Sequence, residues 1–139
     1  LVRKEKYELP PEAIREMIIN AHCHRNLLDE SCIQVAVYDD RLEVTSPGGL
    51  YNGLTYEEIM NGHSKIRNKG IANIFSQMGL VEAWGSGIKR ILNAAEEYGL
   101  PKPKFQEFDN MFRVELFRNS FPMINEKENI GEASEKHRK

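Results

Sequence analysis

This 139-residue sequence has little cysteine, no long apolar run and no large excess of either charge. Its two cysteines, Cys23 and Cys32, cannot build a disulfide framework, so we expect a protein of the reducing cytoplasm. No run approaches the ~20 apolar residues of a membrane-spanning helix, which predicts that a membrane is not a partner. With 19 basic and 21 acidic residues, the chain lacks the basic surplus of a dedicated nucleic-acid binder.

Several motifs of common enzymes are also missing. No G-x-x-x-x-G-K-[ST] segment is present, so a nucleotide would not be held by a P-loop, and helicase activity built on paired P-loop folds is excluded for this chain. The absence of G-x-S-x-G, C-x-x-C and H-x₃-H spacings argues against a serine hydrolase and a zinc site. The sequence starts without methionine or a signal-peptide apolar core, so we expect a fragment of a longer protein.

The first half of the chain predicts a helix followed by a β-hairpin. A Pro-Pro-Glu start precedes residues 11–24, whose apolar residues recur at helical spacing. These residues are Ile14, Met17, Ile18 and Ala21. Residues 33–46 alternate in polarity on both sides of Asp39-Asp40, which is typical of two strands joined by a turn.

The remaining elements complete one small α+β domain. Thr55 with Glu58 three residues later predicts a capping box and a short helix to about Met60. Further elements are expected as helices at 68–78 and 86–98 and strands at 104–107 and 111–117. Because no predicted helix can bury its apolar stripe alone, we expect a two-layer α/β sandwich with a mixed, mostly antiparallel sheet covered on one face by helices. The domain is assigned to 1–118, and the polar residues 119–139 to a tail or linker.

One polar stripe on the first helix is the sharpest candidate site. Glu16, Asn20 and His24 are four residues apart, so they share one side of the helix. A carboxylate one turn before a carboxamide is suited to activating water beside a hard cation such as Mg²⁺. The alternative is an ordinary solvated helix face that ends in a histidine.

Two glycine pairs and one loop add candidate phosphate sites. Gly48-Gly49 follows the hairpin, and Gly85-Ser86-Gly87 opens a helix, where free backbone amides suit phosphate oxygens. The loop at 62–68 contains Ser64, Arg67 and Asn68, of which the first two are suited to clamping a phosphate and the third to capping the following helix. The alternatives are turn and cap glycines, and a surface loop whose arginine pairs with an acid.

These motifs occur in an order that resembles a known superfamily. The Glu16-x-x-x-Asn20 pair, Gly48-Gly49 and the GSGIKRI segment at 85–91 resemble the ATP-binding boxes of the gyrase, heat-shock chaperone, histidine kinase and MutL (GHKL) ATPases. At the level of one branch, four segments resemble the C-terminal domain of bacterial transcriptional regulators and RecG-like ATP-dependent helicases that carry an N-terminal Schlafen/AlbA-like DNA-binding domain. The segments are AIREMIINAHCHRN, DDRLEVTSPGGLYNGLT, GHSKIRN and GLVEAWGSGIKRI.

The resemblance implies a histidine kinase-like ATPase fold with ATP and Mg²⁺ as cofactors. In it Asn20 would lie near Mg²⁺, Glu16 would be the catalytic base, and Gly48-Gly49 would lie under the base or ribose. The nucleotide site would also include His24, the loop residues Ser64, Arg67 and Asn68, and, near the phosphates, Gly85, Ser86 and Gly87. The chain departs from the superfamily at 44–47, Val-Thr-Ser-Pro, where an Asp usually reads the adenine amino group, and in a lid shortened to about 62–68.

From these features we predict a degenerate ATP-binding regulatory module of a bacterial DNA-binding transcriptional regulator. Nucleotide is the expected partner, and DNA is expected to bind only through domains outside this chain. Two alternatives stay open: an active Mg²⁺-dependent ATPase, and a dimerisation scaffold that no longer binds nucleotide. A homodimer is compatible with each of them.

Overall fold

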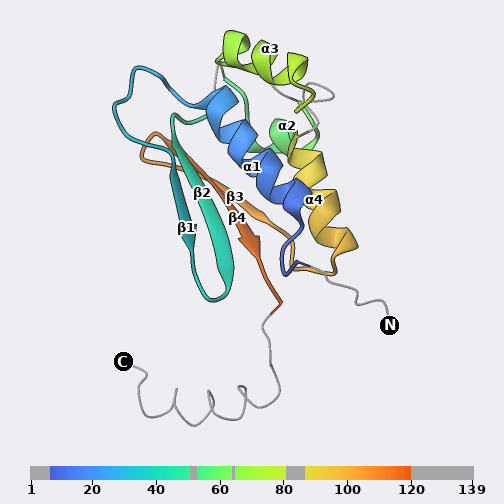
Figure 1. Ribbon diagram of the computed structural model, residues 1–139. Helices are drawn as coiled ribbons and strands as arrows, with labels where there is room; N and C mark the ends of the chain where they lie inside the picture. The colour runs from blue at the N-terminus through green and yellow to red at the C-terminus, as the bar shows by residue number, and fades with distance from the viewer. Residues whose placement is uncertain (1–6, 51–52, 64, 81–86, 120–139) are drawn as a thin grey trace, which may run out of the picture.

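Four antiparallel strands form one sheet, and the helices cover one of its faces (Figure 1). The computed structural model describes residues 7–50, 53–63, 65–80 and 87–119. The strands are β1 (Gln34–Val37), β2 (Arg41–Pro47), β3 (Lys104–Phe108) and β4 (Met111–Phe117), in the order β1-β2-β4-β3. The expected two-layer α+β sandwich is confirmed, and every strand pair in the described residues is antiparallel.

The helices lie within one or two residues of where the sequence predicts them. They are α1 (Pro11–His24), α2 (Tyr56–Met60), α3 (Lys69–Gln77) and α4 (Gly87–Glu97). In α2 the Thr55 hydroxyl accepts a hydrogen bond from the Glu58 amide, and the Glu58 side chain accepts one from the Thr55 amide, so the predicted capping box is confirmed. Ser86, the first residue of the predicted last helix, lies outside the described residues.

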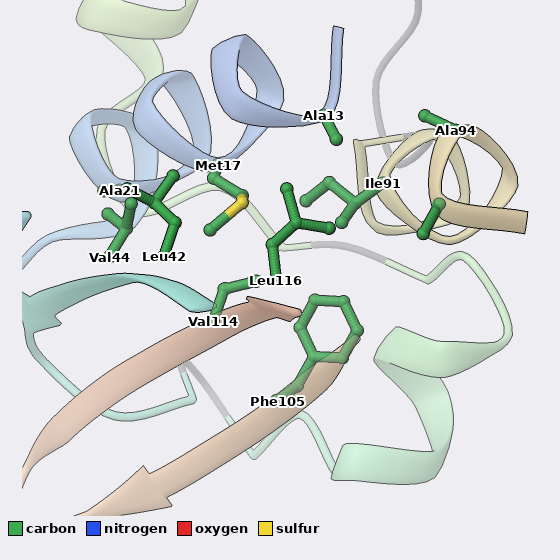
Figure 2. Close-up of a cluster of buried hydrophobic side chains, with 11 residues drawn as sticks. Ala13, Met17, Ala21, Leu42, Val44, Ile91, Ala94, Phe105, Val114 and Leu116 are labelled. Atoms are coloured by element: carbon green, nitrogen blue, oxygen red, sulfur yellow. The ribbon is translucent and has the colours of Figure 1, made fainter. Parts of the chain in front are cut away.

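The core fills the space between the sheet and the pair α1 and α4 (Figure 2). α1 contributes Ala13, Met17 and Ala21, and α4 contributes Ile91 and Ala94, all of them buried. The strands contribute alternate residues from one sheet face, namely Leu42, Val44, Phe105, Val114 and Leu116. This alternation fixes the strand register, because a slip of one residue would turn every core side chain to the opposite face.

A second, smaller cluster joins α1 to α3. Ile19 and Cys23 of α1 pack against Ala72 of α3, so α1 buries two sides rather than the single stripe expected from its periodicity. Ile18, which the helical spacing assigns to the core, is 36% exposed, whereas the neighbouring Ile19 is 8% exposed. The physical reason is α3, which lies across the C-terminal end of α1 (Figure 1) and covers the side that carries Ile19 and Cys23.

Three segments meet at the C-terminal end of α1: the residues after α1, the end of β2 and the turn between β3 and β4. The Asn26 amide donates to the Pro47 carbonyl at 2.6 Å, and the Gly48 amide donates to the Asn110 carbonyl at 2.6 Å. Asn110 and Asp109 have φ values of 58° and 46°, as a tight hairpin turn between β3 and β4 requires. These bonds hold the end of β2 beneath α1.

None of the helices described is long and apolar enough to cross a membrane.

Candidate functional site

A pocket opens between α1, the end of β2, the start of α4 and the segment after α2. Its lining includes all three residues of the α1 polar stripe, Glu16, Asn20 and His24, together with Gly48, Gly49 and Gly87. The pocket is open to solvent, and about 1060 Å³ of space free of atoms lies in the pocket and its mouth taken together. The candidate residues from α1, the β2 turn and α4 are therefore placed around one cavity.

One end of the pocket lies where α4 begins against α1. A Cβ atom at Gly87 would lie 3.0 Å from Asn20 Nδ2 and 3.4 Å from Glu16 Oε2, so glycine permits this close approach. Among the described residues, nothing hydrogen-bonds the Asn20 amide. The first amides of a helix have no partner within the helix and attract anions. This end of the pocket therefore contains a side-chain amide, that of Asn20, with no hydrogen-bond partner among the described residues.

Glu16 is buried at the same end, not solvated as a simple helix face would be. Its side chain is 6% exposed, and its Oε1 accepts a hydrogen bond from Arg90 Nη1 at 3.2 Å. Burial raises the pKa of Glu16 above its usual value, and the neighbouring Arg90 charge opposes this rise. Burial and the Glu16 charge also raise the pKa of the Cys23 thiol to about 11, which keeps it protonated and unreactive.

The opposite end contains His24 as a neutral imidazole. Burial and the nearby Arg67 charge lower the pKa of His24 to about 4, and a hydrogen bond to the backbone of Lys65 opposes this only in part. A neutral imidazole has one donor nitrogen and one acceptor nitrogen, so His24 can present an acceptor to a ligand.

This lowered pKa predicts a pH dependence of stability. Between pH 6.5 and about 4 the unfolded chain binds a proton at His24 that the folded chain excludes. His24 therefore does not lower the free energy of unfolding above pH 6.5, and lowers it by about 3 kcal/mol on acidification to pH 4. Glu16, whose pKa is raised, acts in the opposite sense in both the wild type and the variant. We expect His24→Gln to remove the His24 contribution in urea unfolding measured at pH 7, 5.5 and 4.5. Parallel pH profiles of the two proteins would contradict this.

Arg67 and Asn68 stand beside the pocket rather than in its lining. The Arg67 guanidinium donates to the carbonyls of His24 at 2.9 Å and Gly49 at 3.0 Å. Asn68 occupies the predicted N-cap position of α3, but its side chain does not cap that helix. Its Nδ2 instead donates to the carbonyls of His22 and Arg25 at the end of α1. We therefore give both residues the role of holding the α1 terminus.

The two glycines after β2 are in different surroundings. Gly48 has a φ of 108° and is packed against the Arg67 guanidinium and the Asn26 amide, so a side chain has neither room nor a relaxed backbone there. Gly49 lies against the Glu107 carboxylate, which accepts a hydrogen bond from the Leu50 amide. The candidate residues Ser64, Gly85 and Ser86 lie outside the described residues.

Sequence patterns did not single out Ser46 and Lys65, which also line the pocket. A serine in a strand gives no signal by itself. Its place two residues after Val44 puts it on the core face of β2, which the strand alternation predicts. Lys65 belongs to the loop at 62–68, where the residue type gave no hint of its position.

The residues present fit a magnesium ion that arrives with a nucleotide. In the part of the chain that the structure describes, no three acidic, histidine or cysteine side chains form a group able to hold a metal by themselves. Mg²⁺ in nucleotide sites takes most of its oxygens from phosphates and water, with one or two from the protein. The unpartnered Asn20 oxygen is suited to supply one of these.

Comparison with known proteins supports this reading of the architecture. The structure is similar to the crystal structure of the DIP2311 protein from Corynebacterium diphtheriae, with a TM-score of 0.74 and 29% sequence identity over 80% of this chain. The match spans 23% of the length of that protein chain. None of the curated proteins matches the sequence. A family pattern matches residues 30–116, more than half of the sequence. The chain thus belongs to the family described as "Putative ATP-dependent DNA helicase recG C-terminal".

Proposed function

We propose that this chain is a nucleotide-binding regulatory module that takes up ATP with Mg²⁺ in the pocket between α1 and β2. The observation that carries the proposal is the Asn20 amide, which lines the pocket beside the first turn of α4 and has no hydrogen-bond partner among the described residues. An amide oxygen can coordinate Mg²⁺, and N–H groups at a helix N-terminus can bind the phosphate that carries the ion. The family description, which includes the words "ATP-dependent", supports an adenine nucleotide.

Binding without rapid hydrolysis is the form of this function that we favour. Glu16 lies at the same end of the pocket and is the candidate base for attacking water. Its carboxylate is already engaged by Arg90 at 3.2 Å, so it would have to leave that ion pair before it could orient an attacking water. We assign Glu16 and Arg90 to holding α4 against α1, with any turnover slow.

We infer that nucleotide occupancy is reported to DNA-binding domains outside this chain, in keeping with the 23% of a related chain that it spans. Strand translocation is not part of the proposal, because the sequence contains no P-loop. The dimerisation scaffold is the competing function, and it requires no ligand.

A thermal unfolding series separates nucleotide binding from the scaffold. At a Mg-ATP concentration of about 100 times the Kd, binding stabilises a folded chain by about 2.7 kcal/mol, which raises its Tm by roughly 8 °C. A scaffold that binds no nucleotide would melt at the same temperature with and without Mg-ATP. Phosphate release from the same samples then tests the second half of the proposal. We expect release near background in the wild type and in Glu16→Gln, with both proteins stabilised by Mg-ATP. Turnover that Glu16→Gln abolishes would instead identify an ATPase.

A further inference from the structure

The inner wall of the pocket contains a serine hydroxyl with no protein partner. Ser46 lies at the end of β2 on the face that packs under α1, and only 4% of its surface is exposed. Among the described residues, no group donates to its hydroxyl or accepts from it. The hydroxyl is not sealed inside the protein, because among the described residues Arg25 Nε is the only side-chain nitrogen or oxygen that is both closed to solvent and without a hydrogen-bond partner. It therefore faces the pocket.

Such an arrangement has a cost unless something in the pocket meets the hydroxyl. A buried hydroxyl without a hydrogen bond is unfavourable, and alanine would occupy the same place without that penalty. The neighbouring Thr45 shows the contrast, because on the opposite sheet face its hydroxyl accepts a hydrogen bond from Arg113 Nε at 2.9 Å. Ser46 thus differs from its neighbour, because it lines the pocket and has no hydrogen-bond partner among the described residues.

Ser46 and His24 lie at the same end of the pocket, away from Glu16. The Arg67 guanidinium bridges the carbonyls of His24 and Gly49, three residues after Ser46, which brings the end of α1 onto the end of β2. Glu16 is eight residues before His24 on a continuous helix, which separates their backbones by about 12 Å. A nucleotide whose phosphates lie beside Glu16 and Gly87 would therefore place its base toward Ser46 and His24.

We propose that Ser46 and His24 read the base of the bound nucleotide and accept adenine and guanine nearly equally, an inference that rests on the proposed nucleotide-binding function. A hydroxyl donates and accepts, so it can meet either a 6-amino group or a 6-oxo group. The acceptor nitrogen of neutral His24 needs an N–H group, which both purines supply. A carboxylate in place of Ser46 would only accept, and would therefore select the amino group of adenine and repel the oxygen of guanine.

Competition titrations of the 139-residue chain with Mg-ATP and Mg-GTP test this. We expect the two Kd values of the wild type to lie within tenfold of each other. Ser46→Ala should weaken both by about fivefold to tenfold, the value of one hydrogen bond. Ser46→Asp should shift the preference toward ATP by more than tenfold. Thr45→Val is the matched control, because it removes a hydroxyl from the other face of the same strand, and both Kd values should stay unchanged. Each variant's Tm is recorded to show that it is folded.

The outcomes separate this inference from the function on which it rests. A wild type that binds ATP at least 100-fold more tightly than GTP would overturn the base-reading pair and leave nucleotide binding intact. A folded Ser46→Ala protein with both Kd values unchanged would also overturn it, whatever the fate of Ser46→Asp. A wild type that binds neither nucleotide would overturn the proposed function itself, and the inference with it.

Discussion

Asn20→Ala is expected to weaken Mg-dependent nucleotide binding by roughly 10-fold to 100-fold while leaving the fold intact. The loss corresponds to one hydrogen bond or ligand contact to a charged partner. The fold should survive because no described residue hydrogen-bonds the Asn20 side chain, so its removal leaves nothing unpaired in the protein. The measurement is the Kd of an ATP analogue with Mg²⁺ and with EDTA, and the difference between the two conditions should disappear in the variant.

Asn93→Ala on the exposed side of α4 is the matched control. It removes the same amide from a helix without touching the pocket, and both its Kd and its Mg²⁺ dependence should equal those of the wild type. If the folded Asn20→Ala protein binds nucleotide as the wild type does, the amide is only part of the helix surface, and the proposed role of Asn20 as a magnesium ligand is wrong.

Arg67→Met should cause the largest loss of stability. The substitution leaves the carbonyls of His24 and Gly49 without the donors that now lie at 2.9 and 3.0 Å. Hydrogen bonds from a charged donor contribute about 1.5–3 kcal/mol each, and since the two share one guanidinium we expect a combined loss of about 3 kcal/mol. For a domain of this size the Tm should fall by roughly 10 °C.

Two further variants identify the cause. Arg67→Lys keeps the charge but cannot span two carbonyls, so it should recover only part of the lost stability. Arg118→Met removes an arginine whose ion pair with Glu8 is on the surface, and should change the free energy of unfolding by less than about 1 kcal/mol. An Arg67→Met protein that melts within 2 °C of the wild type would show that the end of α1 is held by other contacts.

The sequence predicts the elements well because each carries its own local signal. The α1 helix begins with proline at its first position, and the hairpin turns at two aspartates between alternating residues. α2 is marked by its capping box. These signals are all within a few residues of one another, so they do not depend on the rest of the chain.

The sheet's uncovered face shows what local patterns miss. β2 is buried on both faces, although the helices cover only one. On the other face the Glu43 carboxylate pairs with Arg41 Nε at 2.7 Å and with Arg113 Nε at 3.4 Å, so long side chains from two strands cover one another. This arrangement depends on the pairing of β2 with β4, about 70 residues apart, which no periodicity reveals.

The candidate site was predictable to the same extent. The stripe Glu16, Asn20 and His24 follows from helical spacing, and its place along one pocket follows from the fold. The contacts of Arg67 and Asn68 with the end of α1 do not, because they join segments more than 40 residues apart. A loop residue's type tells which bonds it can make, and the fold decides where the partners lie.

Titration of the 139-residue chain with a non-hydrolysable ATP analogue in a calorimeter, with Mg²⁺ and then with EDTA, tests the central claim most directly. We expect one site per chain, a Kd that weakens at least tenfold when Mg²⁺ is removed, and a saturable heat signal. No heat of binding at analogue concentrations up to the millimolar range, from protein that melts cooperatively, would contradict it and leave the scaffold as the function of this fold.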